Sequence, residues 1–217
     1  MSRYKAVILD FDGTMCDTRG LIVSTMQQTL ACLGLPSRSD DECAAMIGLP
    51  LKQTFTDLLP VDDATGDLCA ETYRRIFSIN NTPGAVKPFP GVIDTVSRLH
   101  SAGLLVTIAS SRSHASLDDF VRRMELAPYI PYILGAGDVD NAKPAPDMVV
   151  KTLTDNNLRP DEAVVVGDTV FDIRMAHAAG VAAAGVTYGN GQRDELDNEH
   201  AEYVINKFSE LEKIVSL

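Results

Sequence analysis

Two aspartates directly follow the first apolar run of the sequence, residues 5–9, which is predicted to be a buried strand. Strand periodicity places Asp10 and Asp12 on one side of the chain and Phe11 on the other. Two carboxylates beside the flexible Gly13 suit a nucleophile and a proton shuttle. An ordinary polar turn is the alternative interpretation. The position at the carboxyl end of a buried parallel strand, where open α/β sheets bind ligands, favours the functional one.

Hydroxyl and cationic side chains stand in two further stretches. Ser110-Ser111-Arg112 ends a second apolar run, where hydroxyls and backbone N–H groups could surround an anion, although a serine N-cap is the simpler interpretation. Lys143 precedes a predicted helix N-terminus, where a cation is misplaced unless an anion accompanies it. A phosphate contact is therefore slightly favoured over a plain surface lysine.

A second pair of acids follows the apolar run 163–166. Asp168 stands at the end of that predicted strand, and Asp172 is spaced to form a helix capping box with Thr169. Capping accounts for Asp172 alone, but it leaves Asp168 without a structural reason. A carboxylate in that place could complete an oxygen-ligand site for a hard cation such as Mg²⁺.

The composition of the 217-residue chain is that of a soluble globular protein, with 45% apolar and 23% charged residues. This length predicts one large domain, or one domain with an insert. The formal net charge of −11 makes nucleic acid and membrane surfaces poor partners. Four cysteines without a Cys-x-x-Cys pair argue against zinc or a disulfide framework and fit a reducing cytoplasm. The first apolar run is too short for a signal peptide or a transmembrane span.

Strands and helices alternate along most of the chain. We predict strands at 5–9, 104–109, 130–134, 163–166 and 182–187, and helices at 92–102, 117–126, 148–154 and 170–179. This alternation predicts an α/β fold with a parallel sheet covered on both faces. One region breaks the pattern: between Thr18 and Asn80 only helices are predicted, at 21–33, after a capping box at Ser39–Glu42, at 51–59 and at 68–79. A Pro- and Gly-rich linker, 82–91, follows.

Taken together, the four stretches that carry candidate catalytic or binding residues resemble the motifs of the haloacid dehalogenase superfamily of phosphohydrolases. The family pattern is Asp-x-Asp-Gly-Thr, then a Ser or Thr after a strand, then a Lys, then Gly-Asp-x-x-x-Asp. All four parts are present, as residues 10–14, Ser110, Lys143 and residues 167–172. The resemblance covers nearly the whole chain.

The resemblance implies a division of the chain into two parts. The expected catalytic core is a doubly wound, Rossmann-like parallel sheet formed by residues 1–16 and 85–217. The helical insert, residues 17–84, is similar to the small α-helical cap domain of the family.

The resemblance also implies a Mg²⁺-dependent phosphatase mechanism. Asp10 would attack phosphorus and form an aspartyl-phosphate, while Asp12 would protonate the leaving oxygen and then activate water. Mg²⁺ would bind the Asp10 carboxylate, the Asp12 backbone carbonyl and Asp168, with Asp172 nearby or directly bound. The phosphoryl oxygens would be held by Ser110, Ser111 and Lys143.

The substrate is implied only as a small phosphorylated metabolite. Family members that cleave carbon–halogen or carbon–phosphorus bonds lack the second aspartate, so Asp12 indicates phosphate esters or anhydrides. Residues 10–14 with Asp17-Thr18, and the stretches 48–51 and 185–191, are similar to phosphoglycolate phosphatases and related pyrophosphatases. Ala109-Ser-Ser111, which replaces their usual Thr-Asn-Lys, is more similar to sugar-phosphate phosphatases and β-phosphoglucomutase.

Several functions therefore stay open beside a phosphatase for phosphoglycolate-like esters or sugar phosphates. A sugar phosphomutase shares every catalytic residue, and an inorganic pyrophosphatase shares the subfamily motifs. A non-catalytic phospho-acceptor signalling domain is a remote alternative, because it would be shorter and would have no helical insert.

Lys52 is the one base among residues 40–71, which hold eight acids. It follows a Gly-Leu-Pro-Leu turn that could present it toward the core site. We predict that Lys52 contacts a negative or polar group on the leaving portion of the substrate, with a solvated helix-start lysine as an equal alternative. Thr14 and Arg112, which lie in the first motif and beside the second, are further candidates for substrate specificity.

Overall fold

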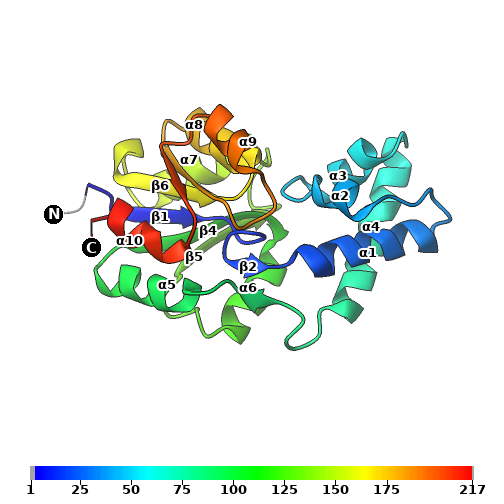
Figure 1. The fold of residues 1–217 in the computed structure, drawn as a ribbon, viewed down its shortest axis with the longest axis horizontal. Coiled ribbons are helices and arrows are strands. Elements are labelled where there is room, and N and C mark those ends of the chain that lie inside the picture. The colour runs from blue at the N-terminus through cyan, green and yellow to red at the C-terminus, as the bar shows by residue number, and fades with distance from the viewer. Residues whose placement is uncertain (1–2, 217) are drawn as a thin grey trace.

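The structure, a computed structural model, describes residues 3–216. Its centre is a six-stranded sheet in the order β5-β4-β1-β6-β7-β8, and every neighbouring pair is parallel (Figure 1). The chain runs outward from β1 through β4 and β5, then returns beside β1 at β6 and continues outward. This doubly wound order leaves a ligand-binding crevice at the carboxyl ends of the strands next to β1. The strands are β1 (Ala6–Leu9), β4 (Leu105–Ser113), β5 (Tyr132–Ala136), β6 (Ala163–Gly167), β7 (Ala182–Val186) and β8 (Tyr203–Ile205).

Helices cover both faces of this sheet, because both faces of its central strands are apolar. One face packs against α5 (Val92–Ser101), α6 (His114–Arg123) and α10 (Leu211–Ile214). The other packs against α7 (Asp147–Asp155), α8 (Val170–Ala178) and α9 (Arg193–Asn198). Two short 3-10 turns complete the core, η1 (Pro160–Glu162) and η2 (Phe208–Glu210).

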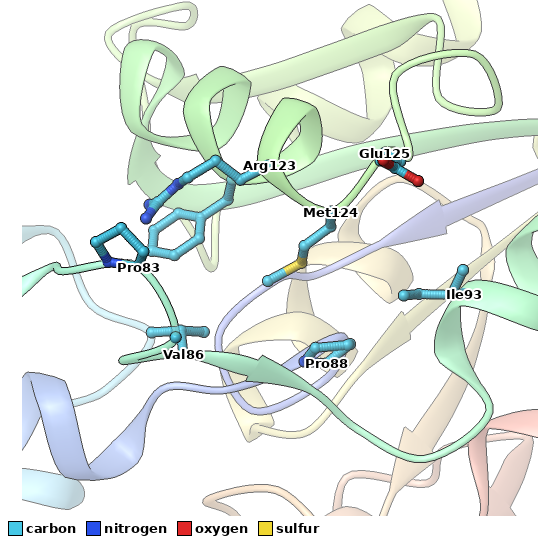
Figure 2. Close-up of a pocket in the computed structure, with 9 residues that line it drawn as sticks. Pro83, Val86, Pro88, Ile93, Arg123, Met124 and Glu125 are labelled. Atoms are coloured by element: carbon cyan, nitrogen blue, oxygen red, sulfur yellow. The ribbon is translucent and has the colours of Figure 1, made fainter.

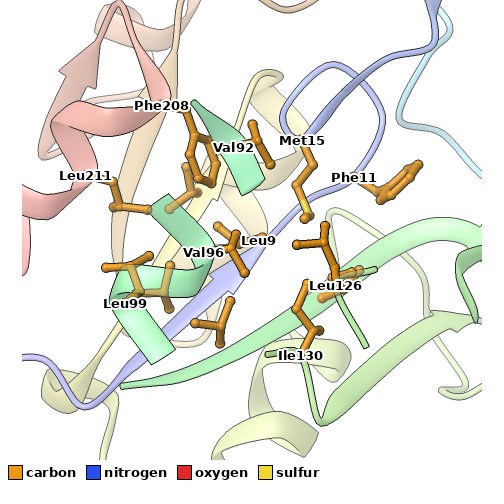
Figure 3. Packing of buried hydrophobic residues seen from close by; sticks show 14 of the residues in the cluster. Leu9, Phe11, Met15, Val92, Val96, Leu99, Leu126, Ile130, Phe208 and Leu211 are labelled. Carbon is orange, nitrogen blue, oxygen red and sulfur yellow. The ribbon is translucent and has the colours of Figure 1, made fainter. Parts of the chain in front are cut away.

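Alternate residues of β1 show how the two layers are built. Leu9 lies in the cluster that includes Val96 and Leu99 of α5 and Phe208 of η2 (Figure 3). Its neighbour Ile8 belongs to the cluster on the opposite face. All four residues of β1 are buried, so the strand is held from both sides and the position of its carboxyl end is fixed.

Four helices stand apart from the sheet at one side of the molecule (Figure 1). We call them the cap helices: α1 (Arg19–Cys32), α2 (Asp40–Ala44), α3 (Leu51–Leu58) and α4 (Asp63–Asn80). They enclose an apolar cluster of their own, which includes Met26, Leu30, Phe55 and Tyr73. The two chain segments that join them to the core pair as a short antiparallel ribbon, β2 (Cys16–Asp17) with β3 (Lys87–Pro88).

Most predicted elements are present, with shifts at their ends. The second main strand continues to Ser113 after an irregularity in its pairing beyond Ala109, and α6 accordingly begins at His114 rather than near Leu117. Helix α4 begins at Asp63, five residues before the predicted start. Strand β8, helix α9 and the β2–β3 ribbon were not predicted.

Two further expectations concern the cysteines and the membrane. Cys16, Cys32, Cys43 and Cys69 are all free thiols. Among the helices of residues 3–216, none combines the length and the apolarity that a membrane crossing requires.

Candidate active site

A buried lysine, Lys143, joins the carboxyl end of β1 to the start of α8 at the carboxyl edge of the sheet. Asp10 follows β1, Asp172 lies in the first turn of α8, and Lys143 comes from the loop between β5 and α7. The Lys143 Nζ donates to Asp10 Oδ1 and to Asp172 Oδ1, both at 2.6 Å. Lys143 is 2% exposed. The three segments therefore converge on one ammonium group that water scarcely reaches.

Asp172 uses its second oxygen for local structure. Its Oδ2 accepts hydrogen bonds from the Thr169 backbone N–H at 3.0 Å and from Thr169 Oγ1 at 2.8 Å, which is the capping box predicted from the sequence. The same carboxylate thus starts helix α8 and meets Lys143. The structural and functional interpretations of Asp172 are compatible.

Asp168 completes a cluster of three buried carboxylates. Oxygen atoms of Asp10, Asp168 and Asp172 all lie within 4.8 Å of one another. Asp168 Oδ2 accepts from the backbone N–H and the side-chain amide of Asn190, at 2.6 and 3.0 Å, and its Oδ1 accepts from Thr14 Oγ1 at 3.2 Å. Each carboxylate is fully or almost fully buried, so their separation is set by the fold.

The charge of this cluster suits a divalent cation. Three carboxylates against the single ammonium of Lys143 leave two formal negative charges in a buried space. Burial raises the pKa of Asp10 well above its usual value, which Lys143 only partly offsets. Burial and the charge of Asp172 raise the pKa of Asp168 to about 7. A hard cation with oxygen ligands would remove this cost, so the residues fit Mg²⁺.

Lys143 keeps its charge in the same place. Burial opposes the charged ammonium, but Asp10 and Asp172 outweigh burial and raise the pKa of Lys143 above its usual value. Lys143 is therefore a charged donor beside Asp10 that can hydrogen-bond to an anionic group in the site.

Gly13 allows the backbone of the first motif to pass close to Asp168 and Asn190. Its φ of +87° is unfavourable for other residues, and a Cβ there would lie 2.1 Å from Asp168 Oδ2 and 2.3 Å from Asn190 Nδ2. Any side chain at this position would push Asp168 out of place. The glycine of the first motif therefore has a geometric function in the site.

Asp12 is held by an arginine from the neighbouring strand. Arg112 Nε donates to Asp12 Oδ2 at 3.1 Å, and its second guanidinium nitrogen donates to Asp12 Oδ1 at 2.5 Å. Burial would lower the pKa of the Arg112 guanidinium, but the Asp12 carboxylate outweighs burial and raises it. Asp12, two residues after Asp10, is therefore held at both of its carboxylate oxygens.

The two serines of β4 differ in their surroundings. Ser110 is buried and its Oγ accepts from the Arg112 backbone N–H at 3.4 Å. Ser111 Oγ donates at 2.6 Å to the backbone carbonyl of Gly48, in the loop between α2 and α3. Ser111 therefore connects the core site to the cap helices.

A cleft of about 730 Å³ lies between the core and the cap helices. Its floor includes Asp10, Asp12 and Ser110, and its cap side includes Lys52 and Arg74. A second cavity, of about 480 Å³, lies along the segment that leads from α4 to α5 (Figure 2). Its lining contains none of the carboxylates of the site, so the candidate active site is the cleft beside Asp10.

Comparison with known proteins gives the family. The model of the haloacid dehalogenase-like hydrolases matches residues 7–186, which covers most of the chain and every residue of the site except those after β7. The chain belongs to this hydrolase family. The doubly wound sheet is thus that of a haloacid dehalogenase-like hydrolase, as the resemblance of the four motifs predicts.

Individual relatives of this hydrolase carry phosphatase names. It is 33% identical to Probable phosphatase IndB of Dickeya dadantii, over 94% of this chain and 90% of that protein. It is 28% identical to Pyrophosphatase PpaX of Anoxybacillus flavithermus, over 97% and 96%, and 27% identical to Phosphoglycolate phosphatase of Photorhabdus laumondii, over 98% and 93%. A solved haloacid dehalogenase-like hydrolase from Bacteroides fragilis superposes with a TM-score of 0.91 at 26% identity, covering 96% of this chain and 99% of that one.

The fold brings most of the predicted site residues of this hydrolase together. Those that meet at the carboxyl edge of the sheet are Asp10, Asp12, Ser110, Lys143, Asp168 and Asp172. Thr14 is fully buried and supports Asp168. Lys52 lines the cleft, but its Nζ pairs with Asp63 at 3.2 Å and Asp67 at 3.0 Å.

Three features of the site were missed from the sequence. Asn190 donates to Asp168, and the sequence pointed to it only as part of the stretch 185–191, which is similar to phosphoglycolate phosphatases and related pyrophosphatases. The pairing of Arg112 with Asp12 had no signal, because the two residues are 100 positions apart. Arg74 lines the cleft and makes no ion pair within residues 3–216, yet no sequence pattern separates it from Arg75 beside it.

Proposed function

We propose that this hydrolase is a Mg²⁺-dependent phosphatase that transfers the phosphoryl group of a small phosphate monoester to Asp10 and then to water. The observation that carries the proposal is the buried chain Asp10–Lys143–Asp172 with Asp168 beside it. The phosphatase names of the relatives support the same reaction class. The substrate class is a phosphoglycolate-like ester or a sugar phosphate.

Asp10 supplies the nucleophile in this proposal. An Asp10 carboxylate oxygen attacks phosphorus, the bond from phosphorus to the leaving oxygen breaks, and an aspartyl-phosphate remains. Lys143 and Ser110 hold phosphoryl oxygens, with Ser111 as a further candidate for the same task. Asp10, Asp168 and the Asp12 backbone carbonyl would hold Mg²⁺, with Asp172 nearby or directly bound, and the metal would supply charge neutralisation at the phosphoryl oxygens.

Asp12 moves the protons. In the first half-reaction its carboxyl proton goes to the leaving oxygen, and the alcohol departs. In the second half-reaction the Asp12 carboxylate takes a proton from water, whose oxygen attacks the aspartyl-phosphate and releases inorganic phosphate. Asp10 and Asp12 are then restored for the next substrate.

The cap helices supply the other wall of the cleft. We assign residues 17–84 to a cap domain, and residues 1–16 with 85–217 to the catalytic core, with the β2–β3 ribbon at the junction. The four free thiols support a reducing, cytoplasmic location. Nucleic acid and membrane surfaces are not proposed as partners, given the net charge of −11.

Net hydrolysis rather than isomerisation is the expected reaction. A mutase must keep water away from the aspartyl-phosphate until a sugar bisphosphate has turned over in the site, whereas a phosphatase places a water molecule beside Asp12. We therefore expect a screen of small phosphate monoesters and pyrophosphate with Mg²⁺ to release free phosphate, with a small anionic ester preferred. Released phosphate is the readout, and preferred cleavage of pyrophosphate would select the pyrophosphatase alternative.

The matched arm of that screen tests for a mutase. The enzyme is incubated with β-glucose 1-phosphate, Mg²⁺ and a trace of glucose 1,6-bisphosphate, and both products are followed. Glucose 6-phosphate that appears faster than phosphate from any screened ester would replace the hydrolase proposal by isomerisation.

The cap side of the cleft is expected to select the leaving portion of the substrate. Arg74→Ala and Lys52→Ala should each lower kcat/KM for the best anionic ester, by about 10-fold where a charged hydrogen bond is lost, and change that for p-nitrophenyl phosphate by less than about twofold. The larger loss is expected for Arg74, because Lys52 already pairs with two aspartates of α4.

Arg75→Ala is the matched control for these variants. Arg75 is exposed on the same helix, its guanidinium lies 3.8 Å from Cys32 Sγ, and it does not line the cleft. It should leave both kcat/KM values unchanged. Equal losses on both substrates in the Lys52 or Arg74 variant would show that the residue does not read the leaving portion.

A further inference from the structure

Arg112 occupies a place that is costly for a charged side chain. Its side chain is 8% exposed, and both hydrogen bonds of its guanidinium to a carboxylate go to Asp12. A third hydrogen bond runs to Ser116 Oγ at 3.2 Å. A buried guanidinium loses its hydration, and a well-aligned carboxylate must compensate for that loss. The position of Arg112 and the position of Asp12 therefore depend on each other.

Three aromatic rings surround the same guanidinium. Its central carbon lies 5.7 Å from the ring centre of Phe11, 5.0 Å from that of Phe120 and 4.8 Å from that of Phe77. At such distances each ring face attracts the cation and also restricts its movement. Phe11 and Phe120 belong to the core, where their own rings are 5.2 Å apart.

Phe77 comes from the other side of the cleft. It lies in cap helix α4, and it packs against both the apolar cluster of the core and that of the cap helices. Among the rings that touch Arg112, it is therefore the one whose place depends on where the cap helices lie. A movement of α4 would therefore change the surroundings of the guanidinium.

We propose that Arg112 is a positioning residue that orients Asp12 for proton transfer to the leaving oxygen, and that Phe77 couples this orientation to the cap helices. The proposal rests on the aspartyl-phosphate mechanism given above. Arg112 touches neither phosphorus nor the leaving oxygen in this scheme. It acts by fixing the Asp12 carboxylate at two points, which a lysine at the same position cannot do. When Asp12 carries the proton for the leaving oxygen, the hydrogen bond to the protonated oxygen opens and the other one keeps the carboxyl group oriented.

Leaving groups of different basicity separate this function from a merely structural one. A basic alkoxide needs the proton from Asp12, whereas p-nitrophenolate departs without it. Because kcat/KM reports steps up to formation of the aspartyl-phosphate, it is sensitive to the first proton transfer and not to the later attack of water. The measurement is kcat/KM for a series of aryl and alkyl phosphates, plotted against the pKa of the leaving alcohol.

Arg112→Lys is expected to give a loss that grows with the basicity of the leaving group. A misplaced general acid should lower kcat/KM for an alkyl phosphate by about 10- to 100-fold, with a change below about threefold for p-nitrophenyl phosphate. Phe77→Leu is expected to give the same graded pattern with a smaller amplitude. Phe77 does not bind Asp12, so Phe77→Leu leaves the ion pair between Arg112 and Asp12 in place. If the Arg112 variant is unstable, the Phe77 variant alone tests the proposal.

Arg123→Lys is the matched control. Arg123 also faces the ring of Phe120, at 4.6 Å, and pairs with Asp119 at 2.7 Å, but it lines the second cavity and does not contact Asp12 (Figure 2). It should leave the dependence on leaving group unchanged. A uniform loss in the Arg112 and Phe77 variants, no loss, or a gain for alkyl phosphates would each overturn the proposal. Retained activity of an Asp10→Asn protein would instead overturn the proposed mechanism.

Discussion

Phosphatase activity is expected to fall by about 10⁴-fold or more when Asp10 is replaced by asparagine, the scale on which loss of a covalent nucleophile acts. Asparagine keeps the shape of the side chain, but its amide cannot attack phosphorus and is a poor ligand for Mg²⁺. Lys143 keeps a second carboxylate partner in Asp172 at 2.6 Å, so its ammonium is not left unpaired. The variant is therefore expected to fold. Phosphate release from the best ester is the measurement, with thermal melting to verify the fold.

Asp94→Asn provides the comparison for this variant. Asp94 is an exposed aspartate in the first turn of α5 and lies outside the carboxylate cluster. Its replacement should leave turnover unchanged. Turnover near the wild-type rate in a folded Asp10→Asn protein would exclude Asp10 as the nucleophile, and labelled substrate that leaves no phosphate on the wild-type protein after acid quench would argue the same way.

Asp168→Asn is expected to abolish most of the phosphatase activity and also the stabilisation of the protein by Mg²⁺. Chelation of the wild-type protein, or Asp168→Asn, is expected to lower phosphate release by at least about 100-fold, since even the outer partners of metal ligands contribute 10- to 100-fold. Mg²⁺ should raise the Tm of the wild-type protein, because a ligand that binds the folded state stabilises it. The same addition should leave the Tm of Asp168→Asn nearly unchanged.

In the absence of metal, the stability effect of Asp168→Asn is expected to depend on pH. The pKa of Asp168 is raised from the ordinary 3.8 to about 7 in the folded protein, chiefly by burial. Between these two values the unfolded chain binds fewer protons than the folded one, so the contribution of Asp168 to the free energy of unfolding falls as the pH rises from about 4 to about 7. Above that range the full cost is present. Metal-free Asp168→Asn should therefore melt no earlier than metal-free wild type at pH 8.

Asp194→Asn is the matched control, because Asp194 is an exposed aspartate in the first turn of α9 that makes no ion pair within residues 3–216. It should leave both the activity and the response of Tm to Mg²⁺ unaltered. A Mg²⁺-induced rise in Tm that survives in Asp168→Asn would remove Asp168 from the metal site. Early melting of the metal-free variant at pH 8 would show that Asp168 has a structural function instead.

The carboxyl ends of β1 and β6 could be predicted, because their apolar runs stop abruptly there. Residues 6–9 and 163–167 are buried on both faces, and a carboxylate comes directly after each run. Hydrogen bonds between residues close in the sequence could also be predicted. The capping box from Ser39 to Glu42 is present, with the Ser39 backbone N–H 2.8 Å from Glu42 Oε2, because its geometry involves only four consecutive residues.

The elements that were missed or misplaced have weak local signals. Strand β8 has only the three residues Tyr203–Ile205, an apolar run too short to predict a strand, and its pairing with β7 places it in the sheet. The start of α4 is disguised by Gly66, a poor helix former. A Cβ at Gly66 would lie 2.7 Å from Thr56 Cγ2 of α3, so this glycine allows two cap helices to pack closely. Its reason is tertiary, and a local pattern could not show it.

By itself, the sequence determined the α/β alternation, the helical insert and the identity of the carboxylates and the lysine of the site, because strand ends and motif spacing are local properties. Tertiary structure alone decided which partner each of these groups has. Lys143 reaches Asp10 from 133 positions away, and Arg112 reaches Asp12 from 100 positions away. Phe77 joins that pair from a cap helix. Such contacts are decided by how the sheet is wound and where the insert lies on it, and distant ion pairs carry no periodicity that a linear pattern could reveal.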